Sequence, residues 1–90
     1  SGNYVRFTTD ALATDPQATI IYLAYEIILA ADAAGYDMIG AIHAAGKRVD
    51  AWTIREITPS TLAQIERLLA LRVDQITTDD PEGLSMALRA

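Results

Sequence analysis

Cysteine is absent from this 90-residue sequence, which excludes disulfide bonds and metal sites built on thiolates. The absence leaves the redox compartment open, because it fits a reducing or an oxidising environment. Histidine occurs once, at His43, so a two-histidine metal site or acid–base pair is also excluded. Any metal ion would have to bind oxygen ligands or this single imidazole.

Basic residues are few. Seven lysines and arginines stand against twelve acidic residues, the formal net charge is −5, and the longest basic run is Lys47-Arg48. Binding to a phosphate backbone needs a concentrated positive surface, so we expect no nucleic acid partner. Binding to an acidic membrane surface is disfavoured for the same reason.

Long uncharged apolar runs are also missing. The most apolar run, 18–34, is interrupted by Glu26 and Asp32 and is shorter than the roughly 20 residues of a membrane span, so we expect none. Ser1 to Asn3 lack the basic start and the apolar stretch of a signal peptide. The localisation stays open, with the cytoplasm slightly favoured.

Alanine and β-branched residues account for much of the 51% hydrophobic content. This composition suits a layered α/β domain with buried parallel strands. Ninety residues make one small domain with a modest core. We therefore treat residues 1–90 as a single α/β unit.

A five-residue pattern, V-D-x-[W/I]-T, occurs at Val49–Thr53 and again 24 residues later at Val73–Thr77. A helix-period segment, 58–71, lies between the two copies, so the order is strand, helix, strand. Such a βαβ unit has parallel strands and a right-handed crossover. We predict strands at 49–54 and 73–78, with the side chains of Asp50 and Asp74 at corresponding positions.

The two predicted helices of this half carry clear boundary signals. Thr58-Pro59 provides an N-cap and a first helical residue, and Asp80-Pro81-Glu82 opens the last helix in the same way. Apolar stripes should face the sheet from both helices. These stripes comprise Leu62, Ile65, Leu68 and Leu69 in the first helix, and Leu84, Ala87 and Leu88 in the second.

The first half of the chain is harder to interpret. Tyr4 to Thr8 alternates and is rich in β-forming residues, which predicts a first strand, and 9–17 reads as a loop with at most one helical turn. The run 18–34 fits a strand at 19–24 followed by a helix at 26–34, or else one long helix, because short apolar runs suit both periods. We prefer the strand and helix.

Glycine and aspartate mark the ends of a further helix. Gly35 indicates a helix end, Asp37 is the expected N-cap for a helix at 38–45, and Gly46 is the expected C-terminal glycine. Gly40 should weaken this helix by about 1 kcal/mol relative to alanine unless close packing requires it.

Two stretches together resemble the carboxy-terminal end of the glycerophosphodiester phosphodiesterase family. The first is H-A-A-G-K-R-V-D-A-W-T-I at 43–54, and the second is V-D-Q-I-T-T-D-D-P at 73–81. The resemblance covers 42–88 best. It implies a (β/α)8 barrel in which these stretches are strands seven and eight. Two positions depart from the family pattern, because Arg55 stands where asparagine is usual and Arg72 where glycine is usual.

The resemblance implies metal-assisted hydrolysis of a phosphodiester, with a divalent cation such as Mg²⁺ or Ca²⁺ in the complete family site. The family's histidine-arginine pair, second histidine and acidic ligands lie on early strands and are not found in this sequence. A whole barrel takes about 250 residues, so this chain supplies about the last three βα units. The resemblance implies that Trp52 lines the alcohol side of the pocket, and no catalytic or metal-binding residue is assigned to this chain.

Several other residues fit a structural role better than a functional one. His43 sits at a helix end, Asp80 is an expected N-cap, and Asp79 is a weak candidate ligand for a hard cation. Glu26 follows a possible strand but lacks the family's ligand context. Asp50 and Asp74 are expected at strand beginnings, solvated or paired with a nearby lysine or arginine. Tyr22, Tyr25 and Tyr36 read as amphipathic boundary residues.

Two functions follow from this reading, and a third, a small ligand-binding α/β domain, is supported only by the polar residues at the strand ends. The chain is the substrate-lining C-terminal portion of a phosphodiesterase, inactive in isolation, or it is a non-catalytic self-associating α/β assembly module. A partial barrel leaves open sheet edges and a bare inner face. We therefore expect a homo-oligomer or docking to the missing part of a barrel.

Overall fold

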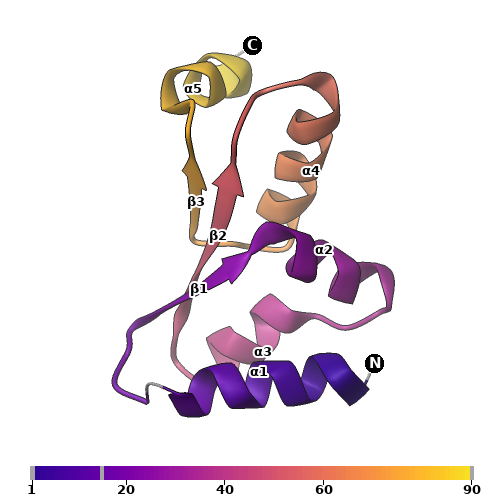
Figure 1. Ribbon diagram of the computed structural model, residues 1–90, viewed down its shortest axis with the longest axis vertical. Coiled ribbons are helices and arrows are strands. Elements are labelled where there is room, and N and C mark those ends of the chain that lie inside the picture. Colours follow the sequence, from indigo (N-terminus) through magenta and orange to yellow (C-terminus); the bar gives the residue numbers. More distant parts are fainter. Residues whose placement is uncertain (1, 15, 90) are drawn as a thin grey trace.

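The computed structural model describes residues 2–14 and 16–89 as an α/β fold around one three-stranded parallel sheet. The strand order is β1-β2-β3, so strands adjacent in sequence are adjacent in space (Figure 1). The elements in chain order are α1 (Gly2–Thr14), β1 (Ile20–Ala24), α2 (Tyr25–Ala33), α3 (Met38–Ala44), β2 (Arg48–Ile54), α4 (Pro59–Ala70), β3 (Gln75–Thr78) and α5 (Pro81–Arg89). The predicted βαβ unit is confirmed as β2, α4 and β3.

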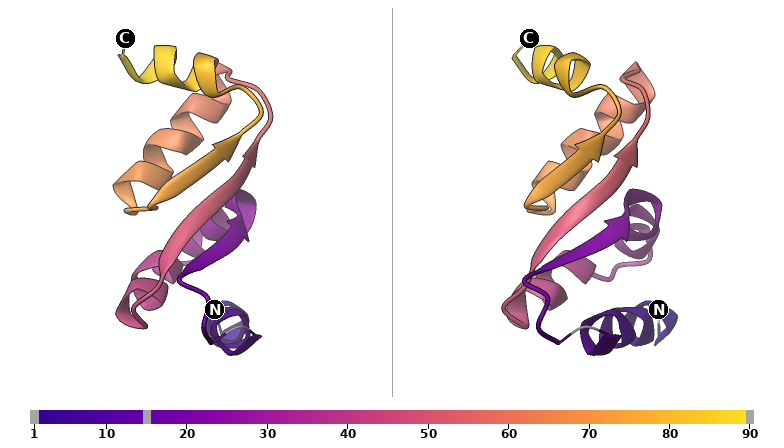
Figure 2. Two further views of the ribbon diagram at one scale, coloured as in Figure 1. Left: turned by 90° about the vertical axis from the view of Figure 1, so that its left-hand side faces the viewer. Right: turned by 60° about the vertical axis from the view of Figure 1, so that its left-hand side comes forward.

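One face of the sheet carries the hydrophobic core. Ile21 pairs with Val49, and Leu23 pairs with Ala51, and all four side chains are buried. Helices α2 and α4 lie behind the strands in Figure 2, and α2 and α3 both contact β2. Burial of this face removes apolar area from water, which is the main stabilising contribution available to so small a domain.

The other face of the sheet is uncovered by any helix of the described residues (Figure 2). Tyr22, Asp50 and Gln75 lie side by side on it, because Tyr22 pairs with Asp50 and Asp50 with Gln75. Trp52 follows two residues later on β2, paired with Ala24. We call this surface the open face.

The ambiguous run resolves into a strand followed by a helix, as preferred. Residue Ala24 ends β1 and Tyr25 begins α2, so the single long helix is wrong. The strand is favoured because its alternate residues Ile21 and Leu23 bury their side chains against the helices.

The predicted helix at 38–45 is confirmed as α3. Asp37 caps it by accepting a hydrogen bond from the Gly40 amide at 2.9 Å. A Cβ on Gly40 would press on this same carboxylate, so a larger residue there would require the Asp37 side chain to shift. Gly35 and Gly46 follow α2 and α3 with φ of 85° and 82°, the left-handed conformation expected after a helix.

Helix α4 begins as the sequence indicated. The Thr58 hydroxyl accepts a hydrogen bond from the Thr61 amide, and the Thr61 hydroxyl accepts one from the Thr58 amide. The stripe is only partly confirmed, because Ile65 and Leu68 are fully buried whereas Leu69 is 44% exposed. Arg67 also joins α4 to α2 through two hydrogen bonds of 2.7 Å to Asp32.

The predicted first strand at Tyr4–Thr8 is wrong, because these residues belong to helix α1. The predicted loop is wrong over Thr9–Thr14 for the same reason, and Asp15 lies outside the described residues. Threonine hydroxyls of α1 donate back to carbonyls four residues earlier, as Thr8 does to Tyr4 at 2.8 Å. Thr8 is buried and α1 contacts α3, so tertiary packing outweighs a β-forming composition.

The predicted correspondence of Asp50 with Asp74 is wrong by one residue. Asp50 pairs with Gln75 and Ala51 with Ile76, so Asp50 shares a face with Gln75 and not with Asp74. An irregularity between Ala51 and Ile54 adds one residue to β2 relative to β3. The repeated motif therefore does not occupy equivalent positions in the two strands.

The last helix begins after Asp80 as expected, with the Gly83 amide donating to its carboxylate at 2.9 Å. Its predicted inner face is only partly confirmed, because Leu84 and Ala87 are half-buried and Leu84 and Leu88 face Ile76, whereas no residue of α5 is fully buried and Leu88 is 50% exposed. Arg72 has φ of 71°. Glycine adopts this left-handed conformation more readily than arginine does.

No single helix within 2–14 and 16–89 is long and apolar enough to cross a membrane. Helices α2 and α3 reach that length and composition only as a pair, with a bend of 107° between them.

Candidate functional site

The open face around Trp52 is the candidate binding surface. Trp52 is 44% exposed and Tyr22 is 63% exposed, so two aromatic rings of this face are accessible to solvent. Both come from neighbouring parallel strands, and Trp52 lies in the C-terminal half of β2, the end at which α/β folds bind ligands. The role of Trp52 in substrate binding stays a prediction.

Asp50 provides the charged group of the open face. It is only 4% exposed, although no helix covers it, and the Thr77 hydroxyl lies 2.8 and 3.0 Å from its two carboxylate oxygens. This contact joins β2 to β3. We expected Asp50 at a solvated strand beginning, whereas it is buried in the middle strand and hydrogen-bonded to a threonine that the sequence analysis did not single out.

His43 and Asp74 form a second polar cluster at the opposite, N-terminal end of the strands. His43 Nε2 lies 2.8 Å from Asp74 Oδ2, and the Val49 amide donates to the same oxygen at 2.8 Å. The Val49 hydrogen bond, followed by that from His43, holds the pKa of Asp74 below its usual range. The pair links α3, β2 and β3, so it has a structural role and lies away from Trp52.

Three acidic candidates do not converge on Trp52. Asp80 caps α5, and Asp79 lies 3.9 Å from Arg55, with both side chains well exposed. Glu26 is exposed in the first turn of α2. Tyr25 and Tyr36 are partly buried against the core, as expected for amphipathic boundary residues.

A metal site is not assembled by the described part of the chain. No group of three or more histidine, aspartate or glutamate side chains within it is placed to hold an ion. The carboxylate nearest to Trp52 in sequence, Asp50, is occupied by Thr77. These residues do not fit the divalent cation of the phosphodiesterase family, and we derive no catalytic step through one.

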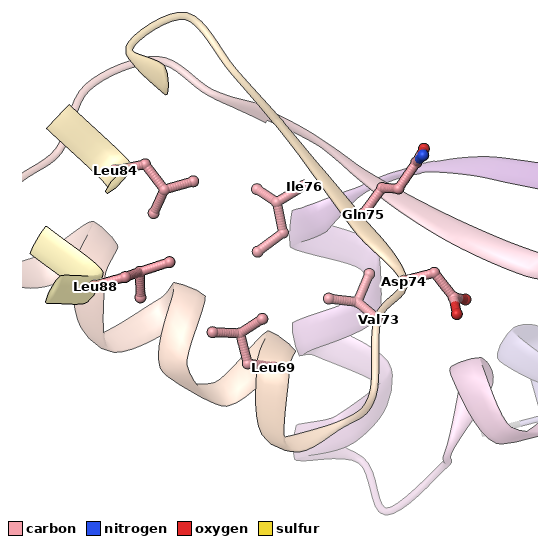
Figure 3. Close-up of a pocket in the computed structure, with 7 residues that line it drawn as sticks. All are labelled: Leu69, Val73, Asp74, Gln75, Ile76, Leu84 and Leu88. Carbon is pink, nitrogen blue, oxygen red and sulfur yellow. The ribbon is translucent and has the colours of Figure 1, made fainter. Parts of the chain in front are cut away.

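An apolar groove of about 200 Å³ lies beside β3 and was not anticipated from the sequence (Figure 3). Leu69 of α4, Ile76 of β3, and Leu84 and Leu88 of α5 point into it, with Val73, Asp74 and Gln75 at its margin. The one exposed residue of the predicted α4 stripe, Leu69, and two leucines of α5 therefore belong to this groove.

The chain was compared with known protein families, with curated proteins and with solved structures, and none of them matches it significantly.

Proposed function

We propose that this chain forms the late wall of a phosphodiesterase-like (β/α)8 barrel and lines the alcohol side of a glycerophosphodiester site through Trp52. The observation that carries the proposal is the asymmetry of the sheet. Three sequential parallel strands have their helices on one face, and the other face presents Tyr22 and Trp52 bare. In a closed barrel that bare face is the interior.

The residues of the open face suit a polyol or an alkyl alcohol. Aromatic rings offer flat apolar contact area, and Gln75 is exposed beside them with an amide that can form hydrogen bonds. Asp50 gives the surface a negative charge, which would repel the phosphate and favour the alcohol moiety beside it. Attack on phosphorus would require the histidine and cation sites from residues outside this chain.

Fluorescence of Trp52 tests the proposal directly, because the sequence contains one tryptophan. Glycerophosphoethanolamine should produce a saturable change in emission, and inorganic phosphate should not. No saturable change up to about 10 mM ligand, with or without Mg²⁺ or Ca²⁺, would contradict the proposal. Tyr22→Ala should weaken binding, whereas Tyr36→Ala, which changes a tyrosine outside the open face, should not.

The isolated chain should not hydrolyse the ligand at a rate above that of buffer containing the same cation. Hydrolysis by the purified chain would contradict the assignment of catalytic residues to another part of the barrel. A Trp52→Ala preparation made in parallel is the control for a co-purifying phosphodiesterase. Hydrolysis that is absent from this preparation belongs to the chain itself and not to a contaminant.

The second candidate function is a non-catalytic assembly module. It is favoured by the apolar groove beside β3, which the wall of a binding site does not require.

A further inference from the structure

β3 is an edge strand, and its outer side presents backbone groups to solvent. It pairs with β2 only, and no described element lies beside it on the other side (Figure 1). The Asp79 amide donates to the Ile54 carbonyl at 2.9 Å, and together with the pairs Ala51–Ile76 and Ile54–Thr78 this fixes the alternation within Gln75–Thr78. Because successive residues of a parallel strand face opposite neighbours, Ile76 and Thr78 direct their N–H and C=O groups away from β2. A row of unpaired groups of this kind is a template for another strand.

The apolar groove opens beside this edge, on the helix-covered side of the sheet. Ile76 forms its floor, while Leu69 and Leu88, 44% and 50% exposed, stand on either side. The helix α5 that carries Leu88 buries none of its residues. A strand added to β3 could therefore gain backbone hydrogen bonds and cover these leucines at the same time.

The charges along the edge favour a second copy running antiparallel. Arg72 precedes β3, is exposed, and makes no ion pair within 2–14 and 16–89, whereas Asp79 and Asp80 follow the strand. Two antiparallel copies bring the cation of each against the anions of the other. A parallel arrangement would oppose arginine to arginine and aspartate to aspartate, which is unfavourable.

We propose that the β3 edge and the apolar groove form the interface of a homodimer, in which two copies pair β3 antiparallel about a two-fold axis at Ile76. In this register the Ile76 backbone groups of the two copies bond to each other, and Arg72 lies opposite Asp80 of the second copy. The axis is perpendicular to the sheet, so both helix layers lie on one side and the two grooves meet. Such an isologous contact closes on itself and does not propagate into fibres.

The dimer leaves the open face and Trp52 free, so it does not depend on the proposed substrate wall. A complete barrel would instead place a parallel strand on the same edge, and the two occupants would compete. The net charge of −5 on each copy opposes association, although physiological salt screens it beyond about 8 Å. A single short strand and one groove form a small interface, for which we expect a Kd of about 10–100 µM.

Sedimentation equilibrium between about 5 µM and 1 mM chain should fit a monomer–dimer equilibrium in this range. Leu88→Glu places a charge in the groove and should raise the Kd at least about tenfold. Met86→Glu is the matched control, because Met86 is 69% exposed on the same helix and does not line the groove. It should change the Kd by less than about twofold.

Amide exchange followed by NMR tests the register in the unmodified chain. The Ile76 and Thr78 amides should be protected at 1 mM and should lose this protection at about 20 µM. The Thr77 amide faces β2 and should exchange at the same rate at both concentrations. Arg72→Asn removes the cation, tolerates a positive φ, and should also weaken the dimer.

The proposal is overturned if the chain is monomeric at 1 mM, or if the Ile76 and Thr78 amides exchange independently of concentration. It is equally overturned if a dimer forms and Leu88→Glu and Met86→Glu weaken it alike. Circular dichroism of each variant shows whether the monomer is folded. If Leu88→Glu fails to fold, the exchange rates of the unmodified chain decide the question alone.

Discussion

Removal of the Asp74 carboxylate should destabilise the domain by about 2 kcal/mol. Asp74→Ala leaves the partly buried Val49 amide without its acceptor, and a hydrogen bond to a charged group contributes about 1.5–3 kcal/mol. The His43 contact adds little, because both side chains are about 30% exposed and such pairs contribute about 0–1 kcal/mol. A domain of this size is stabilised by roughly 5–13 kcal/mol, so the loss should lower Tm by about 10 °C.

The stabilisation by Asp74 should depend on pH, because only its ionised carboxylate makes the full contribution. The pKa of Asp74 is lower in the folded chain than in the unfolded one, so its contribution is present above the unfolded pKa of about 3.9. The contribution is lost as the pH falls through the folded pKa. Asp74→Asn, which keeps an acceptor oxygen without the charge, should be less stable than the parent chain at pH 7. The two should converge in strong acid.

Urea unfolding of the parent chain, Asp74→Asn, Asp74→Ala and His43→Gln at several pH values measures these differences. His43→Gln should cost less than Asp74→Ala, because it leaves the Val49 hydrogen bond intact. Equal stability of the parent and Asp74→Asn at pH 7 would refute the reasoning. So would a difference between them that persists unchanged into strong acid.

Two further substitutions test the packing and the backbone. Leu68→Ala should lower the free energy of unfolding in urea by about 2–4 kcal/mol, because Leu68 is fully buried and its truncation leaves a cavity. A loss below about 1 kcal/mol would show that the core collapses into the vacated space. Arg72→Gly should stabilise the monomer by about 1 kcal/mol, because glycine adopts the observed φ of 71° without steric cost. The free energy of unfolding of Arg72→Gly is measured at a low concentration, at which the chain is monomeric. Arg89→Gly is the control for loss of an arginine, and equal effects of the two substitutions would contradict the backbone argument.

The sequence predicted the second half of the fold because its signals are local. Thr58-Pro59 and Gly46 mark ends where backbone geometry admits few residue types, and β2 and α4 follow from them. Helix α1 could not be predicted in this way, since its composition favours a strand and contacts with α3 stabilise the helix. The strand β1 was correctly preferred over a long helix, because β-branched residues outweigh an incidental helical spacing.

The candidate site was predicted less completely. Trp52 was identified, and it lies on an uncovered surface, but the partner of Asp50 was not. Matching the two V-D-x-[W/I]-T motifs residue by residue placed Asp74 opposite Asp50. A motif cannot report the extra residue that β2 carries between Ala51 and Ile54, because this depends on how the two strands pair.

The hydrogen bond between Thr77 and Asp50 has a consequence for the fidelity of folding. A four-residue strand at a sheet edge has few backbone bonds with which to select its alignment. Sliding β3 by one residue would turn Thr77 toward the core and bring Ile76 beside the Asp50 carboxylate. In that misaligned chain the buried Asp50 carboxylate would lose the hydrogen bond from the Thr77 hydroxyl, and the side chain of Ile76 would be exposed to water. The hydrogen bond between Asp50 and Thr77 should therefore disfavour a β2–β3 register shifted by one residue, which accounts for an aspartate in the central strand of the sheet.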